Sequence, residues 1–367
     1  MDHQNISSTS GLSAYAKIEH LNRLAEYRKE LQKQPQLRQL FIEMTMHCNQ
    51  HCRHCGSKCG DVQEVSSLSK KEIMDVMQEV IDSFDMESFM FCITGGEPLL
   101  RKDLFEIMMV AKNANIPWGM TSNGTLITKV VALKLSECGM KTISISLDGL
   151  KESHEWFRNS LDSYEKTIQG IQNLLEVGIE HVQITTVIHA LNIQELDAMY
   201  DLFSRFGVHS WRVIPIEPIG RAKEQKELLL SKEQYKTLFQ FIKKNRFQKS
   251  MRMETGCSHF LGLNYEKEVR PWYFFCNAGL YTASICSNGD VTSCLDVERR
   301  KEYVEGNIRE QSFKTIWETK FEKYRTDFRK VGKCASCKEY KYCQGDSFHS
   351  WDMDKMEPLV CFKKILF

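Results

Sequence analysis

Residues 47–60 read HCNQHCRHCGSKCG, with four cysteines and three histidines among fourteen residues. They come just after residues 37–45, an apolar stretch that predicts a buried strand. Cys48, Cys52 and Cys55 have the spacing C-x3-C-x2-C, which allows three thiolates to converge on one face of a cluster from a single loop. Three ligands leave one iron of a four-iron cluster open. The alternative is a closed site with Cys59 as the fourth ligand, as zinc prefers.

Composition excludes several classes of protein. The chain has 367 residues, a hydrophobic fraction of 42% and a formal net charge of +1, so it can build a large core and has no excess of basic residues for nucleic acid. We expect no membrane association, because there is neither a signal sequence nor an apolar run of about 18 residues. A cytoplasmic location follows. In a reducing compartment, clusters among the 14 cysteines favour metal binding over disulfides.

Six apolar strand-like runs alternate with helix-period segments such as 69–84 and 192–206. The runs cover residues 37–45, 89–94, 117–122, 142–147, 181–188 and 210–216. This order predicts an α/β fold, a partial (β/α)6 barrel of the TIM type, with its chemistry at the carboxyl ends of parallel strands. The expected divisions are an N-terminal helical segment (1–36), the barrel (37–220), a bridging helical region (221–256) and a Cys-rich region with little regular structure (257–367).

The order of the motifs over residues 37–220 resembles the radical S-adenosylmethionine (radical SAM) enzymes. The second strand ends in Thr94-Gly-Gly-Glu-Pro98, which is similar to the GGEP motif of that family. Its glycines allow close approach of the backbone, and Glu97 is expected to accept a hydrogen bond from the SAM ammonium group. By the same resemblance, SAM chelates the open iron. The residues implied in SAM binding are His54, Gly95, Gly96, Glu97, Pro98, Ser122, Asn123, Ser146, Asp148 and Arg158.

The second half resembles the SPASM extension of these enzymes, which holds two auxiliary 4Fe–4S clusters. Cys276 is followed by Gly289 and then Cys294, and a second group reads C-x2-C-x5-C from Cys334. The resemblance implies Cys334, Cys337, Cys343 and Cys361 at the distal cluster, with Cys276, Cys294 and an upstream Cys257 at the proximal one. A zinc ribbon formed by the four distal cysteines is the alternative.

One proximal ligand is missing from this pattern. The family has a cysteine four residues after the one that matches Cys343, and this chain has Ser347 there. We expect Asp346 as the ligand, because it is already ionised and next in sequence. Cys286 and an iron left open for substrate are the alternatives.

The resemblance implies three 4Fe–4S clusters and SAM as cofactors, and reductive cleavage of SAM to a 5'-deoxyadenosyl radical that abstracts a hydrogen atom. In sulfatase-maturing relatives an Asp directly follows the cysteine that matches Cys294, whereas here Leu295 precedes Asp296. We therefore expect thioether or carbon–carbon crosslinking of a ribosomally made peptide. The alternatives are oxidation of a Ser or Cys on a protein and radical oxidation of a small molecule.

The expected partners are a peptide or protein substrate and an electron donor such as flavodoxin or ferredoxin. The 36 residues before the barrel are too few for a leader-binding module, so we also expect leader binding by the barrel rim or by a separate protein.

Overall fold

The computed structural model describes residues 13–60, 67–248, 251–256 and 259–366. The strands are β1 (Gln39–Glu43), β2 (Met90–Thr94), β3 (Trp118–Ser122), β4 (Met140–Ser146), β5 (His181–Ile188), β6 (Ser210–Pro215), β7 (Arg252–Thr255), β8 (Thr282–Ile285), β9 (Asp290–Thr292), β10 (Gly306–Asn307), β11 (Trp351–Asp352) and β12 (Glu357–Pro358). The α-helices are α1 (Ala14–Lys33), α2 (Lys70–Ser83), α3 (Leu104–Asn113), α4 (Lys129–Glu137), α5 (Lys151–Arg158), α6 (Ser163–Glu176), α7 (Leu196–Phe206), α8 (Lys232–Asn245), α9 (Gly262–Tyr265), α10 (Phe313–Thr319), α11 (Gly332–Ala335), α12 (Tyr340–Cys343) and α13 (Phe362–Leu366).

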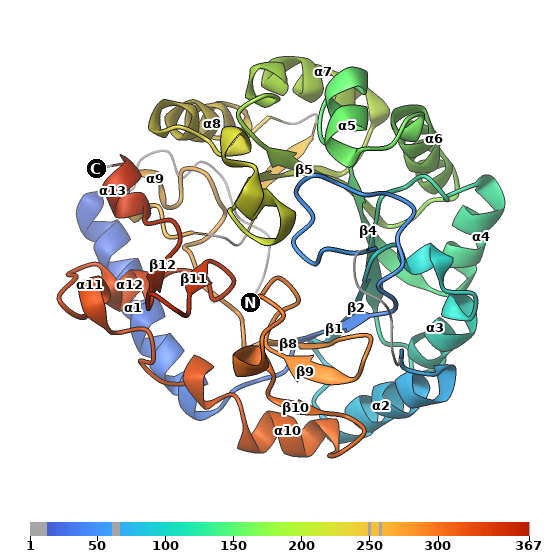
Figure 1. Ribbon diagram of the computed structural model, residues 1–367, viewed down its shortest axis with the longest axis horizontal. Helices are drawn as coiled ribbons and strands as arrows, with labels where there is room; N and C mark the ends of the chain where they lie inside the picture. Colours follow the sequence, from blue (N-terminus) through green and yellow to red (C-terminus); the bar gives the residue numbers. More distant parts are fainter. Residues whose placement is uncertain (1–12, 61–66, 249–250, 257–258, 367) are drawn as a thin grey trace.

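Strands β1 to β7 pair in chain order, and every one of these pairs is parallel. At the other edge β8 pairs parallel with β1, and β9 and β10 follow antiparallel. The curved sheet lies inside a ring of helices that includes α2 to α8 (Figure 1). The expected α/β partial barrel is confirmed. The prediction of little regular structure after residue 257 was incomplete, because β8–β10 extend the barrel sheet.

Local signals explain where the helices begin. Ser69 and Ser231 each cap a helix, α2 and α8, and each forms a capping box with the residue three positions later. Such reciprocal bonds satisfy two backbone N–H groups at the start of a helix. Apolar residues of α2, among them Ile73 and Met77, are fully buried on the side of the sheet.

The inner face of the sheet carries polar side chains. On β6, Trp211 packs outward against aromatic residues of α7 and α8. Arg212 faces the opposite side, because successive strand residues alternate. Its Nε donates to Thr185 Oγ1 at 3.1 Å and its Nη2 to Ser144 Oγ at 3.2 Å. The inside of the barrel is therefore hydrogen-bonded and able to accommodate a polar ligand.

Helix α1 packs against the C-terminal region. Leu21 shares a buried cluster with Phe260, Tyr273 and Phe274, and Lys17 Nζ lies 2.9 Å from Glu268 Oε1. Figure 1 shows α1 beside α12, far in sequence but adjacent in space. The first segment of the chain thus stabilises the last one.

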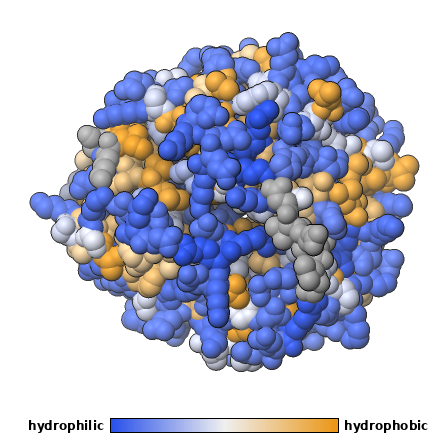
Figure 2. Space-filling model, viewed as in Figure 1, coloured by the Kyte–Doolittle hydropathy of each residue, from blue (hydrophilic) through white to orange (hydrophobic). Residues whose placement is uncertain are grey.

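The face in Figure 2 is covered mostly by hydrophilic residues, with scattered apolar ones. Among the described helices, none combines the length and the apolar character that a membrane span requires.

Candidate functional site

The carboxyl ends of the first two barrel strands are joined through the backbone of the loops that follow them. Gly96 N donates to Thr45 O at 2.7 Å, and Glu97 N donates to His47 O at 2.8 Å. The cysteine loop after β1 and the GGEP loop after β2 therefore run side by side. Both lie at the edge of the sheet where a parallel barrel places its chemistry.

This close approach requires glycine at positions 95 and 96. Gly95 has φ of +145°, and a Cβ there would lie 2.5 Å from Thr45 O. A Cβ on Gly96 would lie 2.1 Å from His47 O, which is a backbone atom and cannot rotate away. Any side chain at position 96 would separate the two loops.

Glu97 is completely buried at the base of this contact. Its Oε1 accepts from Ser122 Oγ at 2.9 Å, and its Oε2 accepts from Asn123 N at 2.9 Å. Burial raises the pKa of Glu97 to about 7, although these hydrogen bonds act in the opposite direction. The structure thus brings together the GGEP motif and the end of β3, two parts of the predicted SAM site.

Cys48, Cys52 and Cys55 come together in the loop after β1, and none forms a disulfide. Cys48 is close enough to Cys52 and Cys55 for their charges to raise its pKa, although burial is the larger cause. Cys59 hydrogen-bonds to Cys55, and this bond lowers the pKa of the Cys55 thiol. The fourth cysteine therefore lies beside the three predicted ligands.

Arg158 lies between a buried carboxylate and one of these thiols. Its Nε donates to Asp148 Oδ2 at 2.5 Å, and its Nη1 lies 3.6 Å from Cys52 Sγ. Asp148 Oδ1 accepts from Val187 N at 2.7 Å, so both of its oxygens have partners within the chain. Asp148 therefore orients Arg158 and links β4 to β5.

The polar atoms that remain fit a bound cofactor. His54 stacks on Phe157 at 4.1 Å with an interplanar angle of 4°, and Phe157 stacks on His189 at 4.2 Å. Within the described part of the chain, His54 Nδ1 and Gln50 Nε2 are buried without a hydrogen-bond partner. Buried polar atoms are normally satisfied, so these two favour a polar ligand beside the thiols. Ser146, also predicted there, ends β4 at the same edge of the sheet.

The predicted distal cysteines gather in the last part of the chain. Cys334 interacts electrostatically with Cys361 and Cys337, and Cys343 with Cys361. Cys334 lies in α11, Cys337 in the segment that follows it, Cys343 at the end of α12 and Cys361 directly before α13. The structure therefore brings together four thiols that are separated by up to 27 residues in the sequence.

Two of the remaining candidates, Asp346 and Cys286, are buried in different loops. Asp346 is buried, with Oδ1 accepting from Phe260 N at 3.1 Å and Oδ2 at 3.0 Å from His259 Nδ1. Cys286 is buried in the β8–β9 hairpin, where burial raises its pKa to about 12. Cys257 lies outside the described residues.

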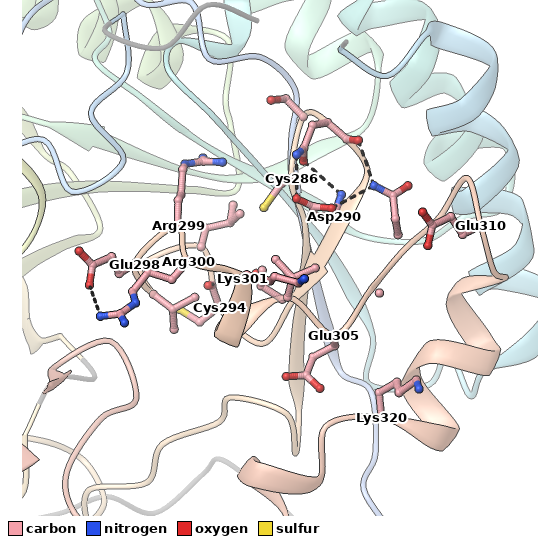
Figure 3. Close-up of a pocket in the computed structure, with 18 of the residues that line it drawn as sticks. Cys286, Asp290, Cys294, Glu298, Arg299, Arg300, Lys301, Glu305, Glu310 and Lys320 are labelled. Atoms are coloured by element: carbon pink, nitrogen blue, oxygen red, sulfur yellow. Dashed lines mark hydrogen bonds and ion pairs between the residues drawn. The ribbon is translucent and has the colours of Figure 1, made fainter. Parts of the chain in front are cut away.

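A pocket of about 780 Å³ opens between the end of β1 and the β8–β9 hairpin. Figure 3 shows Cys286 and Cys294 on its wall, with charged side chains of both signs around them. Arg299 contacts Glu43, and Arg300 Nη2 lies 2.8 Å from Asp354 Oδ1. The two arginines of this pocket are thus paired with acids of the chain itself.

A family model described as the radical SAM superfamily matches residues 42–203, and one described as an iron-sulfur cluster-binding domain (SPASM) matches residues 276–338. This chain is a radical SAM enzyme with a SPASM domain. Its cofactors are SAM and 4Fe–4S clusters. The two matched ranges contain the cysteine loop with the GGEP motif and the Cys276-to-Cys337 region, respectively.

Several known proteins resemble this radical SAM enzyme over most of their length. The AdoMet-dependent heme synthase of Nitratidesulfovibrio vulgaris is 28% identical over 351 residues, which cover 90% of this chain and 93% of that protein. The mycofactocin maturase MftC of Mycolicibacterium smegmatis is 29% identical and covers 83% and 76%, respectively. The structure of anSMEcpe with bound AdoMet has a TM-score of 0.71 at 22% identity, covering 90% of this chain and 91% of that one.

A segment after β6, which no sequence motif marks, also holds the cysteine loop. Gly220 follows β6 with φ of +54°, and a Cβ there would lie 2.2 Å from Cys55 O. Arg221 N donates to Cys55 O at 3.1 Å and its Nη1 to Cys52 O at 2.8 Å. A single Gly-Arg pair after a strand carries no motif that would identify this role.

Arg221→Ala is expected to lower the SAM-cleavage rate about tenfold, because it removes a charged hydrogen bond worth about 1.5–3 kcal/mol from the loop of the cysteines. Production of 5'-deoxyadenosine per bound iron measures this effect under anaerobic reduction. The matched control is Arg205→Ala on the exposed side of α7. Equal rates in the two variants would contradict the role of Arg221.

Proposed function

We propose that Cys48, Cys52 and Cys55 hold the cluster that cleaves SAM and that the enzyme modifies a ribosomally made peptide. The carrying observation is the convergence of the three free thiols with buried Glu97 and the unpartnered atoms of Gln50 and His54. When bound, the cluster and SAM supply a 5'-deoxyadenosyl radical able to take a hydrogen atom from an unactivated C–H bond.

The residues of the chain have distinct roles in this proposal. Glu97, which Ser122 and the amide of Asn123 hold in place, receives the ammonium group of SAM. Burial raises the pKa of the Cys52 thiol, and the positive charge of Arg158, which lies against it, acts in the opposite direction by favouring the thiolate. The stacked rings of His54 and Phe157 close one side of the site against water.

Two features support a peptide as substrate. The pocket between the barrel and the SPASM hairpin is lined by apolar side chains and by charges of both signs, as suits an extended backbone with varied side chains. Among the relatives, MftC is named as a maturase, and solved neighbours include SuiB with its precursor peptide SuiA. We propose a thioether or carbon–carbon crosslink as the product, because Leu295 occupies the position of the sulfatase-maturase aspartate.

A small molecule is the second candidate. The observation that favours it is the 28% identity to AdoMet-dependent heme synthase over 90% of this chain. A porphyrin substrate would bring several carboxylates, whereas Arg299 and Arg300 in the pocket already contact acids of the chain. This balance of charge favours the peptide.

We further propose three clusters, with about twelve irons per chain, of which the auxiliary ones lie at residues 276–361. Flavodoxin or ferredoxin would supply the electron. Leader recognition would use the barrel rim or a separate protein.

The test compares substrates under the same reducing conditions. The reconstituted enzyme is incubated with SAM and either short peptides encoded beside its gene or Fe-coproporphyrin III. We expect 5'-deoxyadenosine to rise at least about tenfold with a cognate peptide, together with a peptide mass loss of two hydrogens. Turnover of the porphyrin without any change in the peptides would overturn the peptide proposal and leave SAM cleavage intact.

A further inference from the structure

The proximal SPASM cluster lacks one thiolate in the sequence, at Ser347, and the structure shows what surrounds that gap. Ser347 is 1% exposed, inside the loop that connects α12 to β11. A serine hydroxyl is a poor iron ligand, because its alkoxide forms only at high pH. Another side chain must therefore complete the ligand set if the cluster has four protein ligands.

Asp346, the ligand expected from the sequence, already has partners for both of its carboxylate oxygens. Asp346 directs one oxygen to the amide of Phe260 and the other to the His259 ring, at 3.1 and 3.0 Å. It has positive φ, as do the two residues before it, and this conformation fixes its direction. Cys286 is buried in the β8–β9 hairpin, within electrostatic reach of Glu43 and Arg299.

His349 lies where the missing ligand is needed. A nitrogen of its ring, Cys294 Sγ and a carboxylate oxygen of Asp296 all lie within 4.8 Å of one another. Cys276, the other proximal thiol of the described chain, also interacts electrostatically with His349. Cys294, Asp296 and His349 therefore lie together, and Cys276 lies within electrostatic reach of His349. These four residues come from three separate loops of the C-terminal region.

The Nε2 atom of the His349 ring contacts a buried carboxylate, which orients the ring. Its Nε2 lies 3.1 Å from Glu217 Oε1, and Glu217 is buried just after β6. If Nε2–H donates to this carboxylate, Nδ1 is the nitrogen that remains for a metal. Metal-binding histidines commonly donate their other N–H to a carboxylate in this way, which fixes the tautomer and the direction of the ring.

We propose that His349 ligates iron in the proximal auxiliary cluster through Nδ1, together with Cys276 and Cys294, in place of the missing thiolate at Ser347. This inference rests on the proposed SPASM clusters. Imidazole is neutral where thiolate is negative, so His349 raises the reduction potential of this cluster relative to an all-cysteine one. Asp296 lies beside the cluster as a neighbouring acid.

The experiment isolates the auxiliary clusters in the full-length chain. Alanine at Cys48, Cys52 and Cys55 removes the SAM-binding cluster and with it the nitrogen of SAM as a source of signal. The reduced protein is examined by pulsed EPR for ¹⁴N hyperfine coupling, and its iron is counted. We expect about eight irons per chain and a strong imidazole coupling on one of the two clusters.

Two substitutions in this background test the ligand. His349→Ala should abolish the coupling and reduce the share of chains that retain the proximal cluster. His349→Cys should keep the iron, abolish the coupling and lower the midpoint potential. His209→Ala, at the opposite end of the barrel, is the matched control and should leave all three readouts unchanged.

The outcomes distinguish this inference from the proposal beneath it. About eight irons without nitrogen coupling, or coupling that persists in His349→Ala and His349→Cys, would overturn the role of His349 alone. Fewer than about four irons in the triple-alanine background would overturn the auxiliary clusters themselves.

Discussion

Replacing Cys48, Cys52 or Cys55 by alanine is expected to abolish SAM cleavage, with a fall of at least about a thousandfold in 5'-deoxyadenosine formation. Residues that act as one unit lose nearly the full effect when any member is removed. A four-iron cluster that has lost one of its three cysteine ligands should also dissociate from the loop, so about four irons per chain should be lost. The measurement is anaerobic reconstitution, iron analysis and quantification of 5'-deoxyadenosine after reduction with dithionite.

Cys59→Ala is the matched control for this prediction. Cys59 is buried and hydrogen-bonds to Cys55, so it is the thiol nearest to a ligand without being assigned as one. We expect its variant to retain cluster and cleavage within about threefold, since only one weak thiol hydrogen bond is lost. Loss of cleavage in Cys59→Ala with retention in Cys48→Ala would reverse the assignment.

The barrel could be predicted because its signals are local. Each of the six predicted strands overlaps an observed strand, and their ends agree within two residues, as for 89–94 against Met90–Thr94. Buried parallel strands are apolar runs of this length, and capped helices such as α2 separate them. The GGEP loop could also be predicted from the sequence, because its close contacts with the backbone of Thr45 and His47 require Gly95 and Gly96.

Other features depend on contacts between distant residues, and no local pattern predicts them. Strands β7 to β10 have two to four residues each, which are too few to show the alternation of apolar and polar residues that identifies a strand. The attachment of β8 to β1 joins residues more than 240 positions apart. Arg221 reaches the cysteine loop across 169 positions, and Glu217 reaches His349 across 132.

The ligand that replaces the missing thiolate at Ser347 could not be predicted from the sequence either. From the sequence alone, Asp346 is favoured by its position next to Ser347. The fold instead pairs it with His259, while His349, two residues after Ser347, faces Cys294. Neighbours in sequence point in different directions within a loop of positive-φ residues, so sequence distance is a poor guide to ligand identity there.

Asp346→Ala is expected to lower the free energy of unfolding by about 3–5 kcal/mol, because removal of one partner leaves a buried charge uncompensated. Burial lowers the pKa of His259, but Asp346 and Glu217 raise it by more, to about 10, so the ring is charged at neutral pH. The amide of Phe260 also loses its acceptor. Anaerobic thermal unfolding, followed by circular dichroism, measures the change as a lower midpoint.

Two further comparisons distinguish a buried ion pair from an iron ligand. Asp354→Ala removes a carboxylate from an exposed pair with Arg300 and should leave the unfolding midpoint nearly unchanged, because exposed ion pairs contribute little to stability. Combining Asp346→Asn with His259→Gln should cost less than the sum of the two single changes, because the charged partner is removed with the carboxylate. Additive costs, together with loss of one auxiliary cluster from Asp346→Asn alone, would instead identify Asp346 as an iron ligand. A structural role for Asp346 makes one more prediction. His259 Nε2 lies 3.4 Å from Glu217 Oε1, and Glu217 also contacts His349. Loss of Asp346 should therefore shift the spectrum of the cluster at Cys294 without removing its iron.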